Sequence, residues 1–459
     1  MTSESRPADV PGVVHVVGVA GVGMSAVAQA LLDQGVRVSG SDRYLDSGDR
    51  LPVLDQLERA GVRLVRQDGQ GVQQDTEAVV VSTAIENDNA DLEAARLHDV
   101  PVVHRAAMLA RLVEGHPTVA VTGTAGKTTV TAMLGHLLAE LGESPSVVNG
   151  GAVVQWAGPD RVGNVRHGIG TRWVIEADES DRSLLQFHPD WAVITNISKD
   201  HFSLDEVTDL FRRFAAQVRK GIVCGPGVVD ILRRIRDANG PAEWIEVRPQ
   251  LANDGDGWST CLEGATCRVP MPGKHNAVNA AMALHMAHQL GHDPHQLVAA
   301  MTSFRGVERR LQVVGDVGGV QVIDDYAHNP AKIAATWRAV AETHARILGV
   351  WRPHGFGPLA LMMDEFVEAW SEVSRPDDRL FLLPVYYVGG TASQEVSSED
   401  LARRLQDMGV NVGVFSDYCC LRAEIKAAVC AGDAVVVMGA RDPGLPRFAR
   451  ELVTQLGSA

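Results

Sequence analysis

One short loop constrains the fold more than any other stretch of this chain: the sequence GTAGKTT at residues 123–129. An apolar, β-branched run from Thr118 to Thr122 precedes it, and a segment with helical spacing from Val130 to Leu141 follows it. Glycines let such a strand–loop–helix turn wrap around a phosphate, and the helix N-terminus offers N–H groups to the anion. The pattern predicts a nucleotide-binding loop. The alternative is a tight turn that carries a surface lysine.

The residue types in this loop indicate which part of a nucleotide each would bind. Lys127 is placed to reach the β- and γ-phosphates of a triphosphate, and the Thr128 hydroxyl is placed to ligate Mg²⁺. The spacing G-x-x-G-K-T-T is a shorter variety of the G-x-x-x-x-G-K loop. We therefore expect contacts with a nucleoside triphosphate from the whole loop: Gly123, Thr124, Ala125, Gly126, Lys127, Thr128 and Thr129.

A second glycine-rich turn, GVAGVG, lies near the N-terminus at residues 18–23. It follows the apolar run Val13 to Val17, precedes a helical pattern, and is followed by a second run that ends at Asp42. This strand–turn–helix unit predicts a diphosphate at a helix N-terminus, with Asp42 accepting a hydrogen bond from a ribose or base. The glycine order differs from the dinucleotide fingerprint G-x-G-x-x-G. Close packing of helix on strand, or a nicotinamide site of an oxidoreductase, are the alternatives.

Acidic residues and one imidazole follow two further predicted strands. The sequence EADESD begins at Glu176, and Asp200 and His201 come after the apolar run Ala192 to Thr195. The carboxyl ends of parallel strands form the edge of a sheet where ligands bind. Carboxylate and hydroxyl oxygens, with an occasional imidazole, suit Mg²⁺ or Mn²⁺. The Thr128 hydroxyl and the carboxylates and imidazole of these two segments could therefore hold a metal ion; a solvated turn and a helix cap are the alternatives.

Strand and helix patterns alternate along the chain from three separate starts, the third at Val320 to Asp325. This alternation predicts an α/β fold with parallel sheets covered by helices on both faces. A chain of 459 residues is long enough for several domains. We expect three, at residues 1–115, 116–312 and 313–459, with residues 235–260 forming a loop excursion or a small β-element.

Composition excludes several classes of protein. The formal net charge is −15, which disfavours binding to nucleic acid or to an anionic membrane surface. The chain lacks any run of about eighteen apolar residues, which argues against a membrane span. Its N-terminus lacks a basic leader, so a secretory signal is not expected. The six cysteines are scattered without a CxxC pair, as is typical of reduced thiols in the cytoplasm.

Taken in order, the motifs resemble those of the Mur ligase family. They are GVAGVGMS with SGSD, GTAGKTT, EADESD, TNISKDH, PGKHN, GVERR and DDYAHNP, and they cover residues 14 to about 375. The similarity is greatest to members that join L-alanine to UDP-N-acetylmuramate. The resemblance implies a Rossmann-like UDP-binding domain, a central ATP-binding P-loop domain and a Rossmann-like amino-acid-binding domain. It implies an ATP-dependent amide ligase of peptidoglycan precursor synthesis that works through an acyl phosphate, as a monomer or homodimer.

The resemblance also implies roles for individual residues. Lys127, Glu176, His201 and His328 would be the catalytic residues, with His328 near the amino acid. The Mg²⁺ or Mn²⁺ ligands would be Thr128, Glu176 and His201. Beyond the loop, the expected ATP contacts are His275, Asn276, Arg310 and Asp325. The expected contacts of the UDP sugar are Gly21, Val22, Gly23, Met24, Ser41, Asp42, Ser82, Thr83 and Ala84.

The chain departs from the family pattern where the amino acid would bind. The members that join L-alanine to UDP-N-acetylmuramate have PHRYTRT after a strand of the third domain, whereas this chain has PHGFGPL, with Gly355 and Pro358 at the two arginine positions. Ala125 also stands where the family usually has histidine. A buried carboxylate without a cation is costly, so we expect Arg352 or Arg441 to bind it. A different amino acid or peptide as acceptor, or a non-catalytic regulator that binds nucleotide sugar, are the alternatives.

Overall fold

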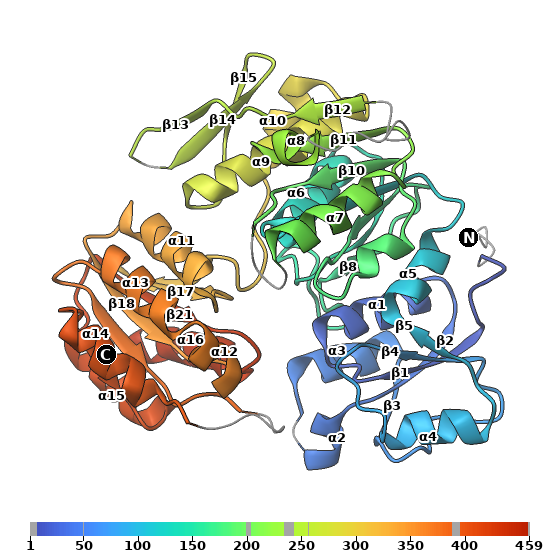
Figure 1. Cartoon of the computed structure of the whole chain (residues 1–459), viewed down its shortest axis with the longest axis horizontal. Helices are drawn as coiled ribbons and strands as arrows, with labels where there is room; N and C mark the ends of the chain where they lie inside the picture. The colour runs from blue at the N-terminus through green and yellow to red at the C-terminus, as the bar shows by residue number, and fades with distance from the viewer. Residues whose placement is uncertain are drawn as a thin grey trace. The chain divides into compact units, whose positions relative to one another are not determined.

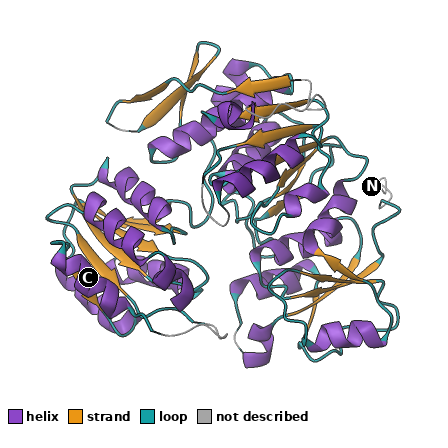
Figure 2. Cartoon of the chain, viewed as in Figure 1, coloured by secondary structure: helices purple, strands orange, loops and turns teal. Residues whose placement is uncertain are grey.

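The computed structural model describes residues 7–48, 50–198, 203–233, 243–255, 257–387 and 395–457. Its contacts separate the chain into two compact units (Figure 1). Strands and helices alternate along both units (Figure 2). The first unit contains Met1–Leu251, Ser259–Pro270 and Val278–Val307, and the second contains Ala252–Trp258, Met271–Ala277 and Glu308–Ala459.

The first unit begins with a five-stranded sheet whose strand order is β3-β2-β1-β4-β5. All of its recorded pairings are parallel. The connections reverse direction between β1 and β4, and ligands bind at such a switch point beyond the carboxyl ends of the strands. The turns after these two strands therefore flank a binding crevice. The elements are β1 (Val13–Val17), α1 (Val22–Asp33), β2 (Arg37–Ser41), α2 (Arg43–Ser47), α3 (Pro52–Ala60), β3 (Arg63–Val65), β4 (Ala78–Val81), α4 (Ala90–Leu97), β5 (Val102–His104) and α5 (Arg105–Val113).

A seven-stranded sheet of order β12-β11-β10-β6-β9-β7-β8 completes most of the first unit. β6, which precedes the GTAGKTT loop, is central and pairs in parallel with β10 and β9. β8 pairs antiparallel with β7 at the edge. The strands are β6 (Thr118–Thr122), β7 (Ser146–Val148), β8 (Val165–Arg166), β9 (Trp173–Glu176), β10 (Trp191–Ile194), β11 (Gly221–Cys224) and β12 (Glu243–Glu246). The helices are α6 (Lys127–Glu140), the short 3-10 helix η1 (Ser183–Gln186), α7 (Leu204–Ala215), α8 (Val228–Arg233) and α10 (Pro294–Met301). Helix α9 (Lys274–Gln289) belongs to the second unit up to Ala277 and to the first unit from Val278.

A small sheet of order β13-β14-β15 occupies part of the region expected to be irregular. Its strands are β13 (Leu251–Asn253), β14 (Trp258–Leu262) and β15 (Ala265–Arg268), and β14 pairs antiparallel with β15. The small β-element predicted there is therefore present, and it extends past residue 260.

The second unit is built on a six-stranded sheet of order β16-β17-β21-β18-β19-β20. One buried apolar cluster joins one face of this sheet to α11, α13 and α14, and another joins the opposite face to α15 and α16. The strands are β16 (Gln312–Val317), β17 (Val320–Asp325), β18 (Arg346–Trp351), β19 (Arg379–Leu382), β20 (Val412–Val414) and β21 (Asp433–Met438). The helices are α11 (Pro330–Ala341), α12 (Phe356–Leu361), α13 (Met363–Val373), α14 (Ser398–Asp407), α15 (Tyr418–Ala428) and α16 (Gly444–Leu456).

The predicted α/β class is confirmed, with antiparallel pairs added at the sheet edges. β16 and β17 form a hairpin because Gly318 and Gly319, with φ of 61° and 78°, make a tight turn that other residues rarely adopt. The domain boundaries at residues 115 and 312 stay predictions. Within the described ranges, no helix is both long enough and apolar enough to cross a membrane.

Candidate active site

Two glycines shape the loop that connects β6 to α6. Gly123 and Gly126 have φ of 133° and 83°, a region that side chains with a Cβ rarely adopt. A Cβ at position 123 would lie 2.0 Å from the Thr195 hydroxyl oxygen. A Cβ at position 126 would lie 2.5 Å from the side-chain oxygen of Asn279. Both positions therefore need glycine for their backbone angle and for space.

Asn196, just after β10, holds the tip of this loop. Its side-chain oxygen accepts from the Ala125 N–H at 3.0 Å, and its side-chain amide donates to the Ala125 carbonyl at 2.9 Å. The Thr124 hydroxyl donates to the same Asn196 oxygen. The backbone at position 125 is thus fixed by a neighbouring strand end although alanine has no polar side chain.

Lys127, the first residue of α6, is held by carboxylates and by its own loop. Its Nζ lies 2.6 Å from Glu179 Oε2 and 3.8 Å from Asp178 Oδ1, and it donates to the Gly123 carbonyl at 3.0 Å. Burial lowers the pKa of Lys127, but the carboxylates of Glu179, Asp178 and Glu176 together outweigh burial and leave the pKa raised. Burial likewise leaves the pKa of Glu179 raised, against the opposing effect of Lys127. Lys127 is therefore positively charged, and its carboxylate partners surround the Nζ atom to which a phosphate would bind.

Glu176, at the end of β9, joins the loop to a neighbouring turn. Its Oε1 accepts from the Thr128 hydroxyl at 3.0 Å, and its Oε2 accepts from the Gly150 N–H at 2.7 Å. Two of the three predicted metal ligands therefore touch each other, and both supply the oxygen atoms that Mg²⁺ prefers. His201 lies outside the described residues. Among the residues that are described, no group of three His, Cys, Asp or Glu side chains is arranged to hold a metal.

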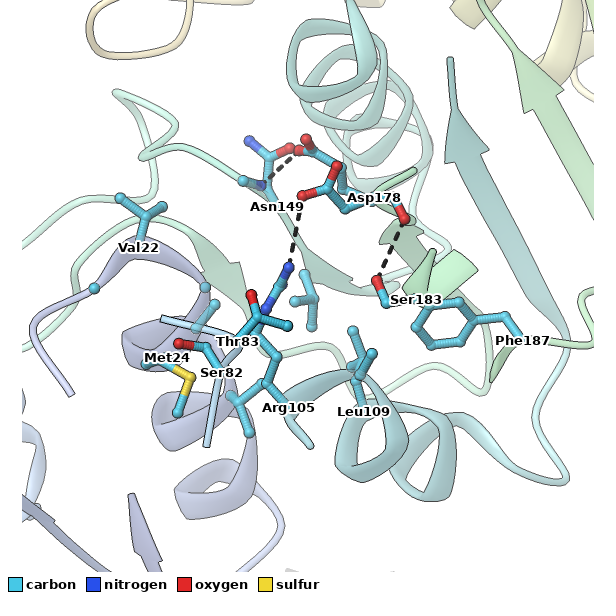
Figure 3. Close-up of a pocket in the computed structure, with 18 residues that line it drawn as sticks. Val22, Met24, Ser82, Thr83, Arg105, Leu109, Asn149, Asp178, Ser183 and Phe187 are labelled. Atoms are coloured by element: carbon cyan, nitrogen blue, oxygen red, sulfur yellow. Dashed lines mark hydrogen bonds and ion pairs between the residues drawn. The ribbon is translucent and has the colours of Figure 1, made fainter. Parts of the chain in front are cut away.

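A cavity of about 360 Å³ lies beside Glu176 in the same unit (Figure 3). The β1–α1 turn, the turn after β4 and the start of α5 line one part of it, and the ends of β7 and β9 line the other. Glu176 lines the cavity and also contacts the nucleotide loop. The predicted sugar-nucleotide residues found in its lining are Gly21, Val22, Gly23, Met24, Ser82 and Thr83.

Three residues predicted to contact the UDP sugar lie behind the glycine turn or on the surface. The Ser41 side chain is fully buried and its hydroxyl donates to Asp91, while its carbonyl accepts from Gly18 N at 2.8 Å. The Asp42 carboxylate accepts from Ala20 N at 2.9 Å, which fixes the same turn. Ala84 is exposed. The arrangement shows Ser41 and Asp42 supporting the turn; their direct contact with a ligand stays a prediction.

The second unit contains the remaining predicted ATP contacts. Asp325, at the end of β17, is buried, and its carboxylate accepts from Leu311 N at 2.7 Å and Ala327 N at 2.8 Å. Its side chain therefore fixes the backbone on both sides of the β-hairpin. The guanidinium of Arg310 lies 5.4 Å from the Tyr326 ring. At the start of α9, His275 is exposed, whereas the Asn276 side-chain amide donates to the Pro272 carbonyl at 2.8 Å.

Histidines and arginines gather at the carboxyl ends of β17, β18 and β21. The rings of His328 and His354 meet edge to face, with centroids 5.0 Å apart. Burial, together with the positive charges of Arg441 and Lys332, lowers the pKa of His354 to about 4. His354 is therefore neutral at pH 7, and its ring packs against that of His328.

Arg352 and Arg441 differ in what surrounds them. Arg352 Nη1 lies 2.6 Å from Asp442 Oδ2, its Nε donates to the Pro384 carbonyl at 2.9 Å, and its guanidinium lies 5.1 Å from the Tyr386 ring. Arg441 is exposed, and its φ of 64° is unusual for a residue with a side chain. Strained backbone of this kind is concentrated at functional sites.

Comparison with known proteins identifies the family. The model described as "Mur ligase family, catalytic domain" matches residues 13–117, "Mur ligase middle domain" matches 121–220, and "Mur ligase, glutamate ligase domain" matches 309–441. A UDP-N-acetylmuramate–L-alanine ligase of Sinorhizobium medicae is 34% identical over 94% of each chain, and that of Rhizobium etli is 36% identical over 94% of each. The chain belongs to the Mur ligase family.

Solved structures agree with the fold of this Mur ligase. The UDP-N-acetylmuramate–alanine ligase of Thermotoga maritima superposes with a TM-score of 0.79 at 24% identity, covering 97% of this chain and 99% of that one. A murein peptide ligase of Psychrobacter arcticus gives a TM-score of 0.68 at 21% identity, covering 97% and 99%. At these identities the likeness concerns the fold alone.

Three charged residues of this Mur ligase escaped the sequence analysis. Arg105 lines the cavity, Glu179 holds Lys127, and Asp178 lies 3.5 Å from Arg105 and 3.8 Å from Lys127. Asp178 and Glu179 belong to the EADESD motif, so their neighbourhood was indicated but their partners were not. No local pattern marks Arg105, because only the packing of α5 beside α1 brings it to the cavity.

Proposed function

We propose that this Mur ligase joins an amino acid, L-alanine, to the lactyl carboxylate of UDP-N-acetylmuramate at the expense of ATP, in peptidoglycan precursor synthesis. The relatives that match it over nearly their whole length carry the name UDP-N-acetylmuramate–L-alanine ligase. The observation that carries the proposal is the position of Glu176, which touches the nucleotide loop through Thr128 and lines the adjoining cavity. A triphosphate on the loop and a sugar nucleotide in the cavity would meet at this residue.

The chemistry requires a carboxylate to be activated before an amine can attack it. Transfer of the γ-phosphoryl group from ATP to the lactyl carboxylate gives an acyl phosphate and ADP. The amine of the amino acid then attacks the acyl carbon, the C–N bond forms, and inorganic phosphate leaves. The protein contributes mainly positioning and neutralisation of negative charge. Lys127 supplies the positive charge, and the fixed loop at Gly123 and Gly126 supplies the position.

We also propose that Mg²⁺ (or Mn²⁺) is held by Thr128 and Glu176, with His201 as the third predicted ligand. The hydroxyl and carboxylate oxygens of Thr128 and Glu176 lie 3.0 Å apart, and both are oxygen donors of the kind that hard divalent cations take. Such a cation supplies charge neutralisation at the phosphate oxygens when it is bound.

For the amino acid, we propose a site beside His328 in which Arg441 binds the carboxylate. Arg352 already has Asp442 and the Pro384 carbonyl as partners. Arg441 is exposed and lies close enough to influence His354. The replacement of the family arginines by Gly355 and Pro358 also favours a second candidate, a ligase of the same type with another amino acid or a peptide as acceptor.

Cytoplasmic localisation is part of the proposal. The six cysteines are free thiols, and three of them, at positions 419, 420 and 430, are exposed. Exposed thiols stay reduced in a reducing compartment such as the cytoplasm.

The test is ADP release by the full chain with ATP, UDP-N-acetylmuramate and each of the twenty amino acids in turn. We expect turnover that depends on L-alanine. Lys127→Met is expected to abolish ADP release, whereas Lys220→Met, which changes an exposed lysine of the same unit, is expected to leave it unchanged. The absence of turnover with every amino acid would overturn the ligase proposal. A rate with another acceptor that exceeds the L-alanine rate would favour the second candidate.

A further inference from the structure

A strained three-residue turn between β21 and α16 carries Arg441. The Asp442 N–H donates to the Ala440 carbonyl at 2.7 Å, and Arg441 between them has a φ of 64°. Turns of this hand are rare, because in left-handed backbone the Cβ of a side chain crowds the neighbouring carbonyl oxygen. Such a conformation persists only where the surrounding structure holds it. The groups that hold this turn therefore also decide where the Arg441 guanidinium points.

The Asp442 carboxylate restrains this turn through three donors. Its side chain is 5% exposed, and both of its oxygens are in use. Oδ1 accepts from the Gly444 N–H at 2.7 Å, while Oδ2 accepts from the Tyr418 hydroxyl and lies 2.6 Å from Arg352 Nη1. Hydrogen bonds to an ionised group are about twice as strong as neutral ones. The residue that follows Arg441 is thus fixed from α15, from the end of β18 and from the start of α16.

Tyr418, the first residue of α15, reaches Asp442 through its hydroxyl alone. Its ring packs against Phe448 of α16, with centroids 5.1 Å apart, and an added Cβ on Gly444 would lie 2.9 Å from that ring. Burial and the Asp442 carboxylate raise the pKa of Tyr418, so the hydroxyl keeps its proton and donates it to the hydrogen bond. Removal of the hydroxyl would therefore leave the packing in place and take away one of the three donors.

We infer that Tyr418 is a positioning residue for the amino acid: through Asp442 it holds the turn that presents the Arg441 guanidinium to the acceptor site. This inference rests on the proposed function, in which Arg441 binds the acceptor carboxylate. Arg441 is exposed and lies close enough to His354 for its charge to act on that ring. Arg352, by contrast, is paired with Asp442 and serves to hold the turn.

The experiment measures initial rates of ADP release by the full chain while the concentration of L-alanine is varied. Tyr418→Phe is expected to raise KM for L-alanine by about 10-fold and to leave kcat and the KM values for ATP and UDP-N-acetylmuramate unchanged. The reason is that the carboxylate contact is the same in the ground state and in the transition state. Arg441→Met is expected to raise the same KM by at least as much. The double variant is expected to match Arg441→Met, because Tyr418 then has no guanidinium left to position.

The control is Arg422→Met. This variant removes the ion pair of Arg422 on α15 with Glu451 on α16 and leaves the contacts of Asp442 intact. It is expected to keep the wild-type KM for L-alanine even where it lowers Tm. A general loosening of α15 on α16 is thereby distinguished from a loss of positioning.

A wild-type KM for L-alanine in folded Tyr418→Phe, beside a raised KM in Arg441→Met, overturns the inference and leaves the proposed function standing. An equal effect of Tyr418→Phe with and without Arg441 also overturns it, because the role would then be structural. If Tyr418→Phe does not fold, Asp442→Asn decides: a raised KM for L-alanine supports the inference and a wild-type KM overturns it. A wild-type KM in Arg441→Met would refute the proposed site for the amino acid together with this inference, and a wild-type chain without turnover would refute the proposed function.

Discussion

Glu179→Gln tests whether the carboxylates around Lys127 compete with nucleotide phosphate. Glu179 is 2% exposed, and its Oε2 lies 2.6 Å from Lys127 Nζ. Two unit charges at that distance attract each other by about 6 kcal/mol at an effective dielectric constant of about 20. Both groups have also lost water, which offsets much of this attraction, and removing one partner of a buried pair costs about 3–5 kcal/mol. Because Asp178 and the Gly123 carbonyl remain as partners of Lys127, we expect Glu179→Gln to lower the free energy of unfolding by about 3 kcal/mol.

Two measurements on this variant are expected to move in opposite directions. Thermal unfolding of this large unit without nucleotide is expected to show a Tm lower by about 5 °C. ADP binding, measured by calorimetry, is expected to become about 10-fold tighter, which corresponds to about 1.4 kcal/mol. The affinity rises because phosphate no longer has to displace a charged partner from Lys127. Glu143→Gln is the control: it removes a carboxylate that pairs with Arg172 in the same unit, so it is expected to leave ADP affinity unchanged.

The result that would refute this reasoning is a fall in ADP affinity together with the fall in stability. That result would mean that Glu179 positions Lys127 for the nucleotide and does not compete with it. Unchanged stability with unchanged affinity would show that the ion pair contributes nothing measurable.

Two further predictions concern Glu176 and Asp324. In Gly150→Ala, the new Cβ would lie 2.5 Å from Glu176 Oε2 and would displace that carboxylate, so kcat for ADP release is expected to fall by about 100-fold. The control is Gly158→Ala, where the new Cβ meets only ordinary van der Waals contacts. A wild-type kcat in Gly150→Ala would contradict the prediction. Burial raises the pKa of Asp324 to about 6, against the opposing effect of Arg309. The folded chain therefore keeps this proton while the unfolded chain loses it near pH 4, and the stability of the second unit falls as pH rises from about 4 to about 6. Asp324→Asn is expected to lose this dependence. Urea unfolding at pH 4.5 and 7 should therefore show the variant gaining about 2 kcal/mol relative to the wild type between the two pH values, and parallel profiles would exclude the effect.

The nucleotide loop was predictable because its chemistry leaves few choices. Left-handed backbone at Gly123 and Gly126 and a lysine at the helix start are local requirements that a single sequence displays. The helix itself begins at Lys127 and not at the predicted Val130, because apolar spacing marks a helix only from its first buried apolar residue. The tight hairpin at Gly318 and Gly319 had a sequence signal, two glycines between β-branched runs, that the alternation of strands and helices obscured.

The partners of charged residues were not predictable, because they depend on which elements pack together. Ser41 and Asp42 belong to a motif that the sequence predicts to contact the UDP sugar. Their hydrogen bonds to Asp91 and Ala20 instead place them behind the glycine turn. Arg105 has no motif, and only the packing of α5 beside α1 gives it a role. The sequence therefore indicates which residues are functional more readily than it indicates which partners their side chains contact.

Asp178 lies between two cations, 3.8 Å from Lys127 and 3.5 Å from Arg105, and this shared position has a thermodynamic consequence. A ligand that engages either cation changes the electrostatic balance at the other through one carboxylate. The two binding equilibria are then linked, and linkage is reciprocal: the factor by which the first ligand alters the affinity of the second equals the factor by which the second alters that of the first. Cooperativity between a ligand at Lys127 and a ligand at Arg105 thus requires no movement larger than a rotation of the Asp178 side chain.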